Sequence, residues 1–269
     1  MAPDAVVTND PPRPESGLLS RSNTNEQWAP TSVLSTLPEQ PQANSSSPLP
    51  FFHILERLKT TKREGWRRFD INHGESISDH MYRMSIITML CPPSLASRIN
   101  IARCTQMALI HDMAELLVGD ITPIDGVSKS EKSRREADTM DYLTKNLLGN
   151  VYGGKNGQQI KEIWQEYEDS QTEESKFVHD VDKMELLLQM LEYEKSSAGK
   201  MDLSEFSWVA RRIVLPEVQE WAAELLEERN AYFAKLGKTP KGVSEISEER
   251  KKQQDEYYGN GIANGTALH

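Results

Sequence analysis

Residues 108–118, ALIHDMAELLV, place one imidazole and two carboxylates in a stretch that is otherwise apolar. The run contains neither Pro nor Gly and predicts a helix, on which His111, Asp112 and Glu115 project toward one side. Burying these three groups among aliphatic side chains is costly unless a partner compensates them. A divalent metal ion is a natural partner for that combination. The stretch therefore predicts a helical fold with a metal site built into it.

The sequence on both sides of this stretch predicts further helices. Ser76 and Asp79 form a capping-box-like start for a helix that ends before Pro92. The helix that contains residues 108–118 begins near Ser94 or Asn100 and runs to about Val118. The other predicted helices cover residues 50–61, 131–148, 158–170, 173–195 and 216–235. No segment alternates polar and apolar residues with a period of two, so the sequence predicts an all-α fold, a single helical bundle.

The two ends of the chain contain few residues that could form a hydrophobic core. Residues 1–49 contain many Pro, Ser, Asn and Thr and few aliphatic residues, and residues 238–269 are charged and then rich in Gly and Asn. Such segments bury too little apolar area to offset the entropy of ordering them. We expect disordered tails at 1–49 and 238–269 and one domain at 50–237.

Charge and composition exclude several classes of function. The formal net charge is −10, which disfavours binding to polymeric nucleic acid, because phosphate neutralisation needs a basic surface. No window approaches 18 consecutive apolar residues, and the first residues show no secretory pattern, so we expect no membrane partner. Cys91 and Cys104 are the two cysteines and lack metal-site or disulfide spacing. A reducing compartment fits, so we expect a cytoplasmic protein without excluding the nucleus.

Three residues elsewhere in the chain are candidate partners for the 108–118 stretch. His80 lies one turn inside its predicted helix, and its alternative role is that of a capping-turn histidine. Asp182 interrupts the apolar helix 173–195, where it is either a ligand or a solvated break. Asp120 follows a helix end, where the macrodipole disfavours a carboxylate, and is either a cation partner or a turn residue.

Two imidazoles and two carboxylates from three helices would form a mixed N₂O₂ ligand set. Such a set suits Mn²⁺, Co²⁺, Fe²⁺, Zn²⁺ or Mg²⁺ and leaves positions open for water or substrate, as in catalytic sites. In the helix of Asp182, His179 is a weaker ligand candidate and Asp180 is expected to be solvated. The four favoured ligands are His80, His111, Asp112 and Asp182.

These residues resemble the H…HD…D signature of the HD-domain metal-dependent phosphohydrolases. The segments ESISDHMYRM (75–84), ALIHDMAELLVGDITP (108–123), SEKSRREAD (130–138) and KFVHDVDKMELLLQMLEYE (176–194) resemble the eukaryotic HD-domain-containing protein 2 group. That group is similar to the bacterial 5′-deoxynucleotidase YfbR. The resemblance spans roughly residues 50–230 and implies an all-α enzyme that dephosphorylates deoxyribonucleoside 5′-monophosphates, with a homodimer as the expected assembly.

The resemblance also assigns roles to residues of the site. It implies that the four favoured ligands bind one divalent cation, with Mn, Co or Mg as the expected metal. Glu115 is expected to act on the attacking water or to hold a second cation together with Asp120 and the carbonyl of Ile121. Arg63, in KREGW (62–66), resembles an arginine near the phosphate or sugar. Trp66 and Asp120 are further expected substrate-binding residues, although Trp66 does not directly follow the arginine as it does in the bacterial enzymes.

Two other functions remain open from the sequence. The first is another phosphohydrolase on the same scaffold, acting on a cyclic nucleotide, a nucleoside triphosphate or an alarmone. The second is a helical interaction module without catalysis. The absence of appended regulatory domains favours a small monoester substrate.

Overall fold

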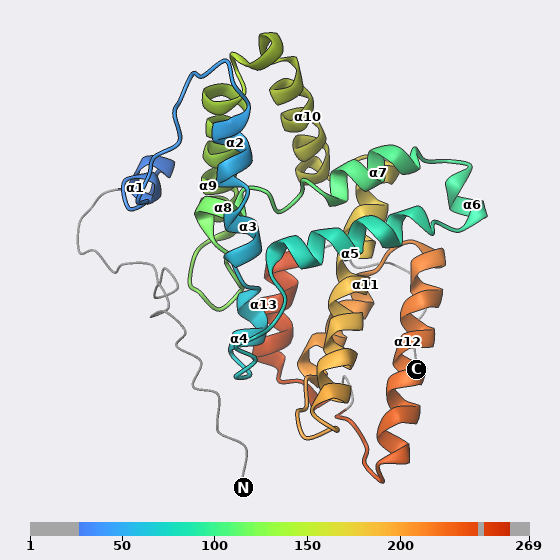
Figure 1. Ribbon diagram of the computed structural model, residues 1–269. Coiled ribbons are helices and arrows are strands. Elements are labelled where there is room, and N and C mark those ends of the chain that lie inside the picture. The colour runs from blue at the N-terminus through green and yellow to red at the C-terminus, as the bar shows by residue number, and fades with distance from the viewer. Residues whose placement is uncertain (1–26, 242–244, 259–269) are drawn as a thin grey trace, which may run out of the picture.

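The computed structural model describes residues 27–241 and 245–258 as an assembly of helices (Figure 1). Within these ranges no strand is present, and a single bridge joins Lys62 to Ser76. The all-α prediction is confirmed. No described helix is long and apolar enough to span a membrane. The elements are α1 (Pro30–Leu34), α2 (Leu49–Ile54), α3 (Arg57–Thr60), α4 (Glu64–Arg67), α5 (Ile77–Met89), α6 (Pro93–Ala96), α7 (Ile101–Ala108), α8 (Glu115–Val118), α9 (Lys129–Asp141), η1 (Tyr142–Leu147), η2 (Val151–Gly154), α10 (Lys155–Asp169), α11 (Glu173–Ser196), η3 (Ser204–Arg212), α12 (Pro216–Lys235) and α13 (Glu248–Tyr258).

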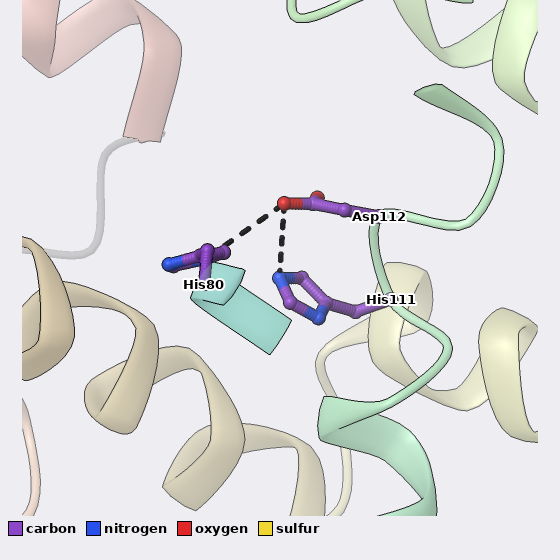
Figure 2. Close-up of side chains that lie close together, drawn as sticks. All are labelled: His80, His111 and Asp112. Atoms are coloured by element: carbon purple, nitrogen blue, oxygen red, sulfur yellow. Dashed lines mark ion pairs between the residues drawn. The ribbon is translucent and has the colours of Figure 1, made fainter. Parts of the chain in front are cut away.

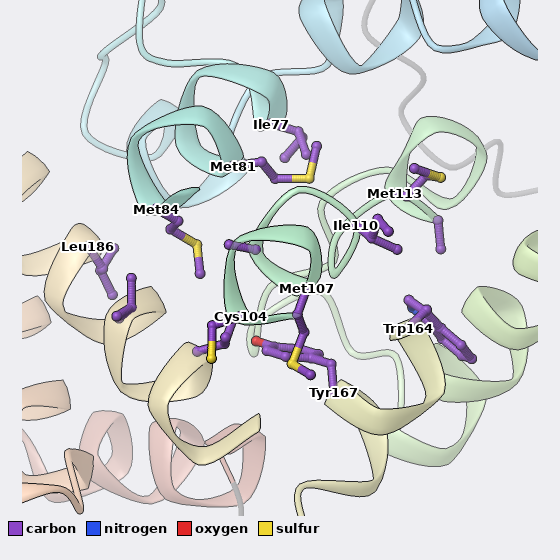
Figure 3. Close-up of a cluster of buried hydrophobic side chains, with 14 of the residues drawn as sticks. Ile77, Met81, Met84, Cys104, Met107, Ile110, Met113, Trp164, Tyr167 and Leu186 are labelled. Atoms are coloured by element: carbon purple, nitrogen blue, oxygen red, sulfur yellow. The ribbon is translucent and has the colours of Figure 1, made fainter. Parts of the chain in front are cut away.

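Helix α11 is the central element of the bundle, because α5, α7, α10, α12 and η3 all pack against it. Its residues Phe177, Val178 and Leu187 are fully buried. Cys104 and Met107 of α7 lie in the same core (Figure 3). The apolar face of α11 is therefore core and is not available as a dimer surface.

The predicted continuous helix through residues 108–118 is wrong, because the chain breaks into turns between α7 and α8. The amides of Met113 and Glu115 donate to carbonyls three residues earlier, at 2.9 and 3.0 Å, as in tight turns and not as in an α-helix. His111 Nδ1 lies 2.9 Å from the carbonyl oxygen of Ala108, the last residue of α7. This contact satisfies a carbonyl at the helix end and favours termination there.

Parts of both expected tails are packed against the helical core. Leu34 of α1 is buried, and the amide of Asn44 donates to the carbonyl of Asn146 at 2.7 Å. At the other end, Ile246 and Gln254 are buried. Residues 1–26, 242–244 and 259–269, which were also expected to be disordered, lie outside the residues that the structure describes. The domain limits at residues 50 and 237 stay predictions.

Candidate metal centre and its cavity

His80 is positioned by the N-terminal cap of α5. The Ser76 hydroxyl accepts from the Asp79 amide at 3.1 Å, and the Asp79 carboxylate accepts from the Ser76 amide at 2.8 Å. The expected capping box is thus present. His80 follows directly and is fully buried, so its side chain enters the bundle instead of capping the turn.

The four predicted ligand residues meet at one place, although they come from α5, the turn after α7, and α11. Nε2 of His80 lies 3.2 Å from Oδ1 of Asp182 and 3.8 Å from Oδ2 of Asp112. Nε2 of His111 lies 3.2 Å from the same Asp112 oxygen (Figure 2). His80, His111 and Asp112 offer ligand atoms that all lie within 4.8 Å of one another. We call these four residues the His–Asp cluster.

The donor atoms of the cluster fit a cation. The Nε2 atoms of both His80 and His111 are buried and have no hydrogen bond of adequate geometry among the described residues. The opposite ring nitrogen of each imidazole is occupied, by Glu185 in one case and by the Ala108 carbonyl in the other. That arrangement directs both Nε2 atoms into the cluster, which is the orientation of ligand imidazoles in protein metal sites.

The carboxylates of the cluster are held in their ionised form. Although burial alone would raise the pKa of Asp112, the neighbouring His111 and Arg63 lower it far below its usual range. Burial opposes ionisation of Asp182 as well, and the contact with His80 lowers its pKa. Both acids therefore present the charged form that a metal ion requires.

Glu185 contacts the cluster and was not predicted as a site residue. Its fully buried carboxylate lies 2.6 Å from His80 Nδ1 and accepts from Arg83 Nε at 2.8 Å. A signal was present, because Glu185 is three residues after Asp182 on α11 and so shares its face. Glu75, Glu185 and His80 form a second group with metal-ligand spacing, on the Nδ1 side of the imidazole.

The other predicted site residues surround the cluster. Arg63 lies 3.2 Å from the Asp112 carboxylate, through its terminal guanidinium nitrogen. Glu115 begins α8, and one of its oxygens is buried without a hydrogen-bond partner in the described chain. Burial and the nearby Asp112 raise the pKa of Glu115 well above its usual value. Asp120 accepts from the Glu64 amide at 2.6 Å, and Trp66 Nε1 donates to Glu75 at 2.7 Å.

A cavity of about 750 Å³ opens onto the cluster, a volume typical of small-molecule sites. Arg63, Trp66, Asp120 and Ile121, which were predicted as site residues, all line it. Its wall also carries charged residues that were not predicted to bind substrate. Among these are Lys132, Glu136, Glu168, Lys183 and Arg212.

The environment of Asp180 corrects one expectation from the sequence. Asp180 is fully buried and accepts from the amides of Val214 and Leu215, the latter at 2.7 Å. It fixes the segment before α12 instead of being solvated. Its neighbour His179 stacks on Tyr167, with ring centroids 3.9 Å apart.

The run of basic residues at the start of α9 divides between two environments. Lys129 and Lys132 line the cavity, where Lys132 pairs with Glu136 at 2.7 Å. Arg134 and Arg135 pair with Glu131, at 2.7 and 2.8 Å. The first part of the run therefore faces the site, with the charge of Lys132 offset by Glu136.

Comparison with known proteins finds relatives that cover most of this chain. The HD domain family model matches residues 55–221. The 5′-deoxynucleotidase hdd1 of Schizosaccharomyces pombe is 47% identical over 72% of this chain and 96% of its own length. The human 5′-deoxynucleotidase HDDC2 is 36% identical over 71% of this chain and 91% of its own. The solved structure of the HD domain-containing protein YGK1 is 32% identical, with a TM-score of 0.55, and covers 77% of this chain and 100% of that one.

Proposed function

This chain belongs to the HD domain family, and we propose that it acts there as a 5′-deoxynucleotidase, hydrolysing deoxyribonucleoside 5′-monophosphates to deoxynucleoside and phosphate. Relatives that cover most of its length carry that name. The observation that supports the proposal best is the His–Asp cluster, in which the buried Nε2 atoms of both imidazoles face the carboxylates, and His111, Asp112 and Asp182 line the cavity.

We assign His80, His111, Asp112 and Asp182 as the ligands of one divalent cation, with Mn²⁺, Co²⁺ or Mg²⁺ as the candidate metal. When bound, such an ion supplies positive charge for the phosphoryl group and lowers the pKa of a nearby water. The absence of thiol ligands around the cluster favours a catalytic over a structural role. Glu115, Asp120 and the Ile121 carbonyl remain candidates for a second ion.

Glu115 is the proposed general base. Its buried carboxyl group borders the cavity beside Asp112, and its raised pKa brings it closer to the pH at which a base takes a proton from water effectively. Removing that proton makes the water a better nucleophile toward phosphorus. Proton transfer of this kind typically contributes about 10²- to 10⁴-fold to a rate.

Arg63 is the proposed phosphate-binding residue. Its guanidinium group lines the cavity and lies 3.2 Å from Asp112, so the cluster itself holds it in place. A guanidinium group can donate two parallel hydrogen bonds to phosphate oxygens. Asp120 and Trp66 also line the cavity and remain proposed substrate contacts, with Trp66 held by its bond to Glu75.

Assembly and compartment remain proposals. A homodimer would use an exposed apolar face, and Tyr82, Ile86 and Met89 form one along α5, with 66%, 43% and 62% of their surfaces exposed. The apolar residues of α12, such as Val218 and Phe233, are buried and do not offer one. Cys91 and Cys104 are both free thiols, which agrees with a cytoplasmic or nuclear location.

A phosphate-release assay tests the proposed activity. The purified protein is freed of metal, reloaded with Mn²⁺, Co²⁺ or Mg²⁺, and incubated with deoxynucleoside monophosphates, ribonucleoside monophosphates, a cyclic nucleotide and a nucleoside triphosphate. We expect release from the deoxynucleoside monophosphates first, and loss of release after chelation. Because opening a cyclic phosphodiester frees no inorganic phosphate, the products are also separated by chromatography. Preferred cleavage of the cyclic nucleotide or the triphosphate would assign another phosphohydrolase activity, and no product from any substrate with any metal would leave an interaction module.

A further inference from the structure

Helix α13 reaches the cavity of the His–Asp cluster, although it lies beyond residues 55–221, which match the family model. It is the last helix of the described chain and packs against η3 (Figure 1). Its residues Arg250, Gln253 and Gln254 line the cavity. We propose that α13 and the adjacent Phe206 form the wall that binds the nucleobase of the substrate. This inference rests on the proposed function, and it assigns the nucleobase to a part of the cavity that lies outside the proposed phosphate-binding residues.

Side-chain contacts fix α13 to η3. Gln254 Nε2 donates to the backbone carbonyl of Glu205 at 2.9 Å, and Arg250 donates to the Glu205 carboxylate at 2.7 Å. Trp208 Nε1 donates to Asp255 at 2.9 Å. Because these contacts tie successive turns of α13 to one short segment, the helix presents a defined side to the cavity.

The wall offers the two kinds of contact that a nucleobase needs. Phe206 lines the cavity, and its ring packs against Trp66 with a centroid distance of 4.6 Å, which holds the ring in place. An aromatic ring can stack on any base. The amides of Gln253 and Gln254 add hydrogen-bonding groups to the same wall.

The amide of Gln254 has one unused acceptor. A backbone carbonyl can only accept, so the bond to Glu205 fixes the NH₂ group of the amide on that side. The remaining oxygen, Oε1, is buried without a partner among the residues that the structure describes, in a side chain that is only 5% exposed. An unpaired buried acceptor is unfavourable, and each of the four bases carries an N–H group that could satisfy it.

The part of the cavity that is lined by α9 and α10 suits the rest of the nucleotide. Lys129, Lys132, Glu136 and Glu168 line it with charges, and its aromatic ring, Tyr167, already stacks on His179. The ammonium groups there match phosphate oxygens, and the carboxylates match sugar hydroxyls, better than either matches the flat apolar face of a base. The base is therefore assigned to the Phe206 and α13 side.

The test compares substrates with and without a base. Gln254→Met removes the amide at similar length. The matched control is Gln219→Met, because Gln219 Nε2 also donates to a backbone carbonyl, that of Ile213 at 2.8 Å, but lies outside the cavity wall. We would measure kcat/KM for the four deoxynucleoside monophosphates and for 2-deoxyribose 5-phosphate, which keeps the ester and the sugar. The readout is the kcat/KM for a deoxynucleoside monophosphate divided by the kcat/KM for 2-deoxyribose 5-phosphate.

We expect Gln254→Met to lower this ratio about tenfold, mainly through KM, and Gln219→Met to change it less than about twofold. Phe206→Leu is expected to lower the same ratio, most strongly for the purine nucleotides. An equal fall for both kinds of substrate, or an unchanged ratio in both cavity variants, would overturn the assignment of the wall. Unmutated protein that cleaves no deoxynucleotide would instead refute the proposed function, which is a distinct result.

Discussion

Nδ1 of His80 lies 2.6 Å from Oε2 of Glu185, and both side chains are completely buried. The second oxygen of Glu185 accepts from Arg83, so the carboxylate is held between an imidazole and a guanidinium group. The contact leaves Nε2 of His80 facing Asp112 and Asp182. It thereby joins α5 to α11, the two long helices that supply ligands to the cluster.

Glu185→Gln is expected to weaken divalent metal binding about 10- to 100-fold, because a carboxylate bonded to the far nitrogen of a ligand imidazole orients it and increases its basicity. Titration calorimetry with Mn²⁺ measures the effect. Glu192→Gln is the control, since Glu192 is also bonded to Arg83, at 2.6 Å, but is half exposed and has no contact with His80. Equal affinities of the two variants would contradict a positioning role for Glu185.

Glu115→Gln is expected to lower kcat by about 10²- to 10⁴-fold, because the amide cannot take a proton from water. The first metal site should survive, since its four ligands are unchanged. Elemental analysis of the loaded variant, together with kcat, separates the two effects. A variant that loses its metal along with its activity would make Glu115 a ligand of the principal ion and not a base.

Glu168→Gln is expected to stabilise the metal-free protein at alkaline pH. Burial, with a contribution from Glu136, raises the pKa of Glu168 to about 7 in the folded protein. The folded state therefore binds more protons than the unfolded state between about pH 4.5 and 7, and stability is lost as the pH rises through this window. The neutral amide avoids that loss. Thermal unfolding should give the variant and the unmutated protein the same melting temperature at pH 4.5, and the variant a melting temperature higher by at least about 2 °C at pH 8.5. An increase in melting temperature that is independent of pH would refute the explanation.

Leu34→Ala tests whether the described part of the N-terminal segment belongs to the folded domain. The side chain is 6% exposed and packs in the core, so its truncation is expected to cost about 2–4 kcal/mol of unfolding free energy. Leu49→Ala, at a leucine that is 56% exposed, should change stability by less than about 0.5 kcal/mol. Urea denaturation measures both. Equal small effects would show that residues 27–48 add nothing to the stability of the domain.

Helices with a strong apolar stripe were predictable from the sequence, and those held by distant polar contacts were not. The sequence predicted residues 173–195 and 216–235, and α11 and α12 span Glu173–Ser196 and Pro216–Lys235. Helix α13 is charged on all sides and is fixed by partners more than 40 residues away, such as Glu205 and Trp208. No local sequence pattern predicts such contacts, because they join segments that are far apart in the chain.

The residues of the His–Asp cluster stood out in the sequence for a different reason. His80 and Asp182 are polar residues in apolar helices, and His111 and Asp112 are polar residues in an otherwise apolar stretch. The family matched by the resemblance is confirmed over residues 55–221. The turn at His111 was missed, because it depends on a bond between that side chain and the Ala108 carbonyl and not on a helix-breaking residue. Asp180 was misjudged for a similar reason, since its partners lie more than 30 residues further along the chain.

Anomalous diffraction from crystals soaked in Mn²⁺ locates the ion directly, because two groups of ligand atoms lie on opposite sides of the His80 ring. We expect one principal peak about 2.0–2.3 Å from Nε2 of His80 and Nε2 of His111, with Asp112 and Asp182 completing the protein ligands. A peak between Glu75, Glu185 and Nδ1 of His80, or no peak near either imidazole, would contradict that expectation.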